Sequence, residues 1–160
     1  MNTDLGSRDD IAYRRELVEK YRPITERLVT YLPWLESKKG TDTSQTFRGQ
    51  GIGDNSIPFP VYDSTLMALV KLLQTSPLMD RNYVYVYSRN RIRNHEDEIR
   101  MIRESELKDI ANICAVLSKY VMEGMRKGTQ WTEAVSSGVF YECIAQLKKD
   151  IEFWDVPINN

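Results

Sequence analysis

The C-terminal half of the chain repeats apolar residues at the spacing of an α-helix, and this pattern constrains the fold more than any other feature. One apolar run extends from Leu107 to Val121, and another extends from Val139 to Ile151. A helical period places such side chains on one face, where they pack against other helices. We therefore predict a helical scaffold from Ser105 onward, with glycines at the ends of its helices.

Helical spacing also appears in the N-terminal half. An apolar stripe begins near Arg8, and Pro23 and Pro33 predict kinks or new helix starts along it because proline lacks an amide hydrogen. A second apolar segment covers residues 66–73, and Asp63 or Ser64 is a suitable residue to cap its first turn. Together these elements predict an all-α fold of about five to six helices.

Two segments interrupt the helical pattern. Residues 37–60 hold four glycines and two prolines with few aliphatic residues, so we predict a long loop there. Alternating tyrosine and valine predict one short extended segment around 82–88, with a helix as the alternative. The apolar fraction of 41% and the charged fraction of 28% are ordinary for a globular protein, so we expect residues 1–160 to form a single domain.

Charge and cysteine usage narrow the setting in which the chain works. The formal net charge is −1, so attraction to a polyanion must come from a local cluster of basic residues. Cys114 and Cys143 lie within apolar helical patterns and form no CxxC pair, so we interpret them as buried thiols in a reducing compartment. The polar N-terminal residues and the lack of a long apolar run favour a cytoplasmic protein with no membrane partner.

The segment at 81–93, RNYVYVYSRNRIR, is the first candidate for ligand binding. If it is extended, its odd-numbered side chains share one face, where tyrosines can stack on bases while arginines pair with phosphates. The candidate ligand-binding residues on that face are Tyr85, Arg89, Arg91 and Arg93. The alternative is an ordinary packed strand whose arginines pair with the acids at 80 and 96–98, and a helix would remove the single-face argument.

The loop at 48–55 is the second candidate. Its backbone could approach a phosphate at Gly51 and Gly53, with the guanidinium of Arg48 beside them. The established phosphate-binding loops join a strand directly to a helix, which is not the context predicted here. The alternative is a flexible loop whose turns need positive φ angles.

His95 lies beside three acidic residues in the sequence NHEDE, and histidine with carboxylates is a suitable ligand set for a divalent metal. Consecutive residues converge poorly on one ion, and the chain has no second histidine for a zinc site. We interpret this cluster as solvated charge and predict no metal, no cofactor and no catalytic residue. An enzyme with a carboxylate or metal site near His95 is kept as an alternative hypothesis.

Residues 117–152 place a helix, a basic turn flanked by glycines, a short Trp-Ala-Val helix and a final helix in succession. This arrangement, together with FPVYDSTLMALVK at 59–71, resembles the C-terminal part of small bacterial or phage domains of uncharacterised function. The resemblance implies a helical fold and a bacterial or phage source. It implies no functional residues.

The leading functional hypothesis is a non-enzymatic binding or interaction module of the bacterial cytoplasm, with tyrosine and tryptophan serving a protein partner or self-association. The alternative is a protein that binds nucleic acid, a nucleotide or phosphate through the segments 81–93 and 48–55. Arginines paired with the local acids and packed away would count against that alternative. Exposed arginines beside a concave surface would favour it.

Overall fold

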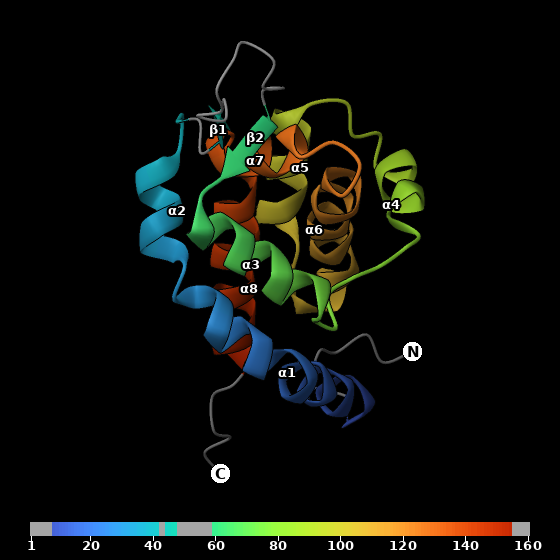
Figure 1. Ribbon diagram of the computed structural model, residues 1–160. Coiled ribbons are helices and arrows are strands. Elements are labelled where there is room, and N and C mark those ends of the chain that lie inside the picture. Colours follow the sequence, from blue (N-terminus) through green and yellow to red (C-terminus); the bar gives the residue numbers. More distant parts are fainter. Residues whose placement is uncertain (1–7, 42–43, 48–58, 155–160) are drawn as a thin grey trace, which may run out of the picture.

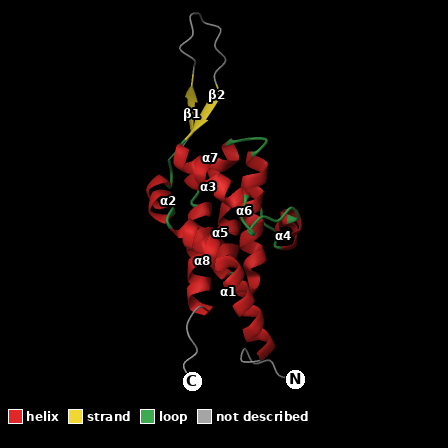
Figure 2. Cartoon of the chain, turned by 60° about the horizontal axis from the view of Figure 1, so that its bottom comes forward, coloured by secondary structure: helices red, strands yellow, loops and turns green. Residues whose placement is uncertain are grey.

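The computed structural model describes residues 8–41, 44–47 and 59–154, and helices dominate these ranges (Figure 2). The helices are α1 (Arg8–Val29), α2 (Leu32–Lys38), α3 (Ser64–Gln74), α4 (Tyr83–Arg89), α5 (His95–Glu104), α6 (Ile110–Gly124), α7 (Thr129–Ser136) and α8 (Val139–Trp154). A 3₁₀ turn, η1 (Leu107–Asp109), precedes α6, and two short strands, β1 (Ser44–Phe47) and β2 (Phe59–Tyr62), pair antiparallel. The predicted all-α class is confirmed, with more helices than the five to six expected.

Helix α8 runs through the middle of the molecule, and other helices surround it (Figure 1). It packs against α1, α2, α5, α6 and α7. Phe140, Ile144 and Leu147 of α8 are fully buried, and so are Ile113 and Leu117 of α6. Because burial of apolar surface stabilises a fold by roughly 25 cal/mol per Å², these two periodic runs supply much of the driving force for folding.

The helix predicted to start at Ser105 begins a few residues later. Ser105 follows the end of α5, where its hydroxyl donates to the backbone carbonyl of Met101 over 2.7 Å. Glu106 and Asp109 then form a reciprocal capping box around η1, and α6 continues from Ile110. The acidic residues near Ser105 are therefore a genuine helix-start signal, displaced by one turn.

Two glycines allow α7 to fit between α6 and α8. Gly138 joins α7 to α8 with a φ of 84°, in the left-handed region that favours glycine. Gly124 of α6 lies so close to the indole of Trp131 that a Cβ atom would overlap the ring. The indole Nε1 of Trp131 donates to the backbone carbonyl of Val121 over 3.2 Å, which fixes α7 against α6.

The two proline predictions have different outcomes. Helix α1 continues through Pro23, so no new helix starts there. The chain leaves the helix at residues 30–31 instead, and α2 begins at Leu32 with Pro33 in its first turn. Proline is tolerated at that position because the first amides of a helix have no intrahelical partner.

The predicted loop at 37–60 is shorter at both ends than expected. Helix α2 extends to Lys38, and β1 pairs with β2 so that Ser44 lies opposite Tyr62. The candidate residues of the glycine loop, Arg48, Gly51 and Gly53, lie outside the described residues.

The prediction of an extended segment around 82–88 is wrong, because residues 83–89 form the helix α4. Tyr83 and Tyr87 lie one turn apart, and their hydroxyls donate to Glu123 and Glu98. Val86 is buried on the same side of the helix. These tertiary contacts, which an alternating Tyr-Val sequence does not reveal, outweigh the β propensity of the segment.

Both cysteines are free and buried, as the sequence indicated. Burial raises the pKa of the Cys114 thiol to about 12, so this thiol stays protonated and unreactive. Among the described helices, none has the length and apolar character that a membrane crossing requires.

Candidate functional site

The most unusual polar group in the described core is the carboxylate of Glu98 on α5, which is 2% exposed. Its Oε2 accepts a hydrogen bond from the hydroxyl of Tyr87 on α4 over 2.5 Å. Its Oε1 accepts from the hydroxyl of Tyr120 on α6 over 2.7 Å and lies 2.8 Å from the Nδ1 of His95. One buried carboxylate therefore joins α4 and α6 to α5.

These partners explain how the fold tolerates a buried acid. An unpaired buried carboxylate costs several kcal/mol, and hydrogen bonds to both oxygens offset that cost. Burial raises the pKa of Tyr87 and of Tyr120, and the negative charge of Glu98 raises both further. Both phenols therefore stay protonated and act as permanent donors to Glu98.

His95 extends this cluster to the surface. Its Nε2 lies 2.8 Å from the Oε1 of Glu133 on α7, while its Nδ1 faces Glu98. A carboxylate only accepts hydrogen bonds, so both contacts are hydrogen bonds when the ring is an imidazolium, in which both nitrogens carry hydrogen. The Tyr120 hydroxyl also lies 3.1 Å from Nδ1. Partial burial lowers the pKa of His95, but the hydrogen bonds to Glu98 and Glu133 outweigh it and hold the pKa above its ordinary value.

A pocket of about 440 Å³ opens above this cluster, a size that suits a small molecule. Besides the cluster itself, Arg93 and Lys119 line it. The Lys119 ammonium lies 4.2 Å from the centre of the Tyr120 ring, and its contact with Glu123 is long, at 3.9 Å. We call this pocket the His95 pocket.

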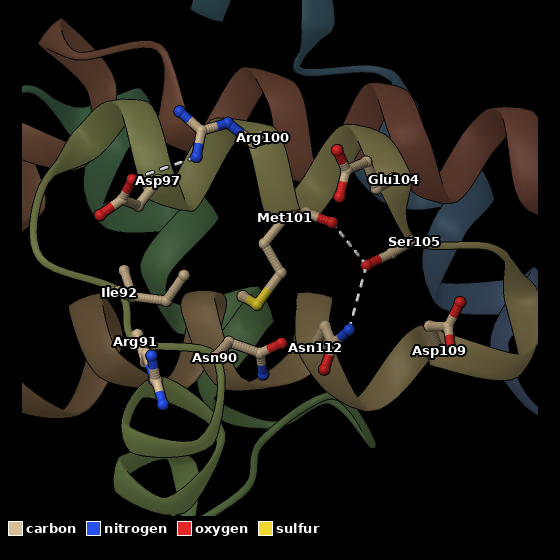
Figure 3. A pocket seen from close by; sticks show the side chains of 10 residues that line it. All are labelled: Asn90, Arg91, Ile92, Asp97, Arg100, Met101, Glu104, Ser105, Asp109 and Asn112. Atoms are coloured by element: carbon tan, nitrogen blue, oxygen red, sulfur yellow. Dashed lines mark hydrogen bonds and ion pairs between the residues drawn. The ribbon is translucent and has the colours of Figure 1, made fainter.

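A second pocket of about 440 Å³ lies between α5 and the loop that follows α4 (Figure 3). In Figure 3 the side chain of Met101 reaches toward the amides of Asn90 and Asn112. Several of its polar groups already bond to one another, since Asn112 donates to Ser105 and Arg100 pairs with Asp97. Its polar side chains are thus less available to a ligand than their number suggests.

The candidate residues of the segment 81–93 do not share one face as an extended strand would require. Tyr85 and Arg89 are both exposed and lie one helical turn apart on the outer side of α4. Arg91 lines the second pocket, and Arg93 lines the His95 pocket. Arg91 has a φ of 54°, which turns the chain between the two pockets.

The side chains of these arginines nevertheless do not pair with the described acids around them. Arg81, Arg89, Arg91 and Arg93 are all exposed, and none forms an ion pair with another described residue. The interpretation in which they pair with the acids at 80 and 96–98 is therefore wrong. Those acids have other roles, because Asp97 accepts from the Arg93 backbone amide and Glu98 is buried.

Most of the His95 cluster is not apparent from the sequence. His95 and Glu98 are not solvated charges as predicted, and their spacing of three residues places them on one face of α5. No sequence signal connects them with Tyr120 or Glu133, which come from other helices. In the described part of the chain, no group of three histidines, cysteines or acids is arranged to hold a metal ion.

No protein-family model, curated protein or solved structure matches the chain. The resemblance to bacterial or phage domains therefore stays a prediction, and function has to be argued from the chemistry of the surface.

Proposed function

We propose that the protein is a non-enzymatic binding module that binds single-stranded nucleic acid through the outer side of α4 and the arginines that flank it. We call this surface the arginine face and define it by Tyr85 and Arg89 on the outer side of α4 together with the exposed Arg81, Arg91 and Arg93, which lie before and after the helix and not on the same helical face. The observation that carries the proposal is a local separation of charge. Residues 81–93 contain four arginines and no acid, in a chain whose net charge is −1. Phosphates are attracted by such a local cluster whatever the total charge of the protein.

The tyrosines of α4 divide between two roles. Tyr83 and Tyr87 point inward and hold the helix through their bonds to Glu123 and Glu98. Tyr85 is 70% exposed and lies one turn from Arg89. An exposed ring beside a guanidinium is the combination that single-strand binding surfaces use, because the ring stacks on a base and the guanidinium contacts a phosphate.

Rigid anchoring of α4 supports the same function. A surface that is already ordered loses little conformational entropy when it binds. The buried Val86 and the two inward hydroxyls fix α4 against α6 and α5, so Tyr85 and Arg89 are presented on a fixed backbone.

The His95 cluster supports an enzyme less well. A general base needs a free lone pair, and both ring nitrogens of His95 face carboxylate oxygens at 2.8 Å. The cluster consequently behaves as a set of mutually satisfied charges.

Binding is tested by fluorescence anisotropy with a labelled single-stranded oligonucleotide at low salt. We expect the wild-type protein to bind and the double variant Arg89→Glu/Arg91→Glu to lose binding. Tyr85→Ala should weaken binding about tenfold, because one base-stacking contact contributes roughly 1–3 kcal/mol.

The matched control is Arg15→Glu/Arg27→Glu, which makes the same change of charge at two exposed positions of α1. It should bind nearly as well as the wild type. Absence of binding by the wild-type protein at low salt, or an equal loss in the control, would overturn the proposal.

A further inference from the structure

The His95 pocket contains a histidine whose outward nitrogen is held in a fixed direction. The buried Glu98 fixes the Nδ1 side of the ring over 2.8 Å, and Glu98 is itself fixed by two tyrosine hydroxyls. A carboxylate on one nitrogen of a histidine sets the orientation of the ring and the hydrogen on the other nitrogen. The Nε2–H of His95 is therefore directed at the partly exposed carboxylate of Glu133, which accepts it.

Among the residues of the His95 cluster, Glu133 has the weakest contacts. Its side chain is 48% exposed, against 3% for Glu98, and its carboxylate is bonded only to His95 among the described residues. An ion pair this exposed contributes little net stability because water competes for both partners. An external anion can therefore take its place on Nε2 without disturbing the buried half of the cluster.

Two further cations border the same pocket. Arg93 is exposed and has no ion pair with a described residue. The side chain of Lys119 is 24% exposed, and its ammonium lies 3.9 Å from the carboxylate of Glu123. With the imidazolium of His95, they outnumber the two carboxylates of the pocket, Glu98 and Glu133.

We propose that the His95 pocket binds a small anion, a carboxylate or a phosphate, whose oxygen displaces Glu133 from the Nε2 of His95. Glu133 acts as an internal substitute that fills the site when the ligand is absent. Arg93 and Lys119 supply the remaining positive charge. The proposal does not rest on nucleic-acid binding by the arginine face, although the two surfaces have Arg93 in common.

The chain contains a single histidine, so the ring of His95 can be observed alone. Protein labelled with ¹⁵N-histidine is titrated at pH 6.5 with inorganic phosphate and, separately, with acetate, while long-range ¹H–¹⁵N NMR spectra follow the Nε2 signal. Sodium chloride at matched ionic strength gives the background. We expect a saturable shift with phosphate, acetate or both, and the stronger of the two identifies the class of ligand.

The informative variant is Glu133→Gln, which removes the charge of the internal competitor at an exposed position. Binding should tighten about fivefold, the factor that corresponds to an exposed ion pair. Glu96→Gln makes the same change of charge on the exposed surface of α5, outside the pocket, and should leave the affinity near that of the wild type. Arg93→Gln should weaken binding.

Two results would overturn the proposal. One is a shift of Nε2 that follows ionic strength alone and does not saturate. The other is an equal affinity in Glu133→Gln and Glu96→Gln. Neither result depends on whether an oligonucleotide binds, so failure here and failure of the proposed function can be told apart.

Discussion

At the scale of single residues, Glu98 is the charge on which the site depends. Its buried carboxylate receives two phenol hydroxyls and one histidine, from three helices. Truncation would leave these donors without an acceptor in a region that water reaches poorly, and such losses are more costly than the net gain from forming the bonds.

We therefore expect Glu98→Ala to lower the free energy of unfolding by about 3 kcal/mol, as breaking a buried charged pair does. Urea denaturation at neutral pH measures the change. Glu104→Ala, at an exposed position of the same helix, should alter stability by less than about 0.5 kcal/mol. Equal effects of the two substitutions on the free energy of unfolding would show that Glu98 does not stabilise the cluster.

His95 predicts a pH dependence with a defined sign. Its pKa is raised in the folded protein by the bonds to Glu98 and Glu133, so the folded state holds the proton more tightly than the unfolded chain does. The stabilisation is complete below the unfolded pKa of about 6.5 and is lost as the pH rises through the folded pKa. The difference in unfolding free energy between wild type and His95→Gln should shrink from pH 5.5 to pH 8.5. If the difference in unfolding free energy grows from pH 5.5 to pH 8.5, the pKa of His95 is not raised in the folded protein.

The sequence predicted the exposed residues of this region, but it could not predict contacts between residues far apart in the chain. Tyr85 and Arg89 were identified as surface groups, but the alternation argument put Tyr83 and Tyr87 beside them. In the helix these two tyrosines point inward and become structural anchors. His95 and Glu133 are 38 residues apart, and no local rule relates them.

At the scale of elements, long helices were predictable and short ones were not. Helices α6 and α8 have 15 and 16 residues, enough turns for apolar periodicity to be seen. Helix α4 has only 7 residues, too few for a helical period to be seen, and its alternating tyrosine and valine are typical of a strand. Helix α5 was missed although NHEDE is a helix start, in which Asn94 accepts from the amide of Asp97 and three acids occupy the first turn.

The packing of α7 on α6 depends on Gly124, and here two effects oppose each other. Alanine in place of a helical glycine gains about 1 kcal/mol of helix propensity. A Cβ atom at this position would overlap the indole of Trp131, whose Nε1 is bonded to Val121. Overpacking of a buried ring typically costs 1–3 kcal/mol.

We expect the steric cost to exceed the propensity gain, so Gly124→Ala should lower the melting temperature. Thermal denaturation followed by circular dichroism measures it. A variant that melts above the wild type would show that α7 moves away from α6 without penalty.

At the scale of the whole molecule, the apolar scaffold and the polar clusters occupy different regions. Helix α8 and its neighbours bury the apolar runs and form the scaffold. The polar side chains of both pockets lie where α4 and the loop after it, residues 90–94, meet α5. The all-α class followed from periodicity alone, but the arrangement that brings α4 and α6 to one buried carboxylate depends on contacts between distant segments.

The salt dependence of oligonucleotide binding tests the central claim most directly, because each phosphate contact contributes to its slope. Four arginine–phosphate contacts to a single strand predict that log K falls with log[salt] with a slope of about −2.8. In Arg89→Glu/Arg91→Glu the slope should fall to about −1.4, or binding should be lost, while Arg15→Glu/Arg27→Glu should keep the wild-type slope. A wild-type slope near zero, or a slope unchanged in the double variant of the arginine face, would contradict the account.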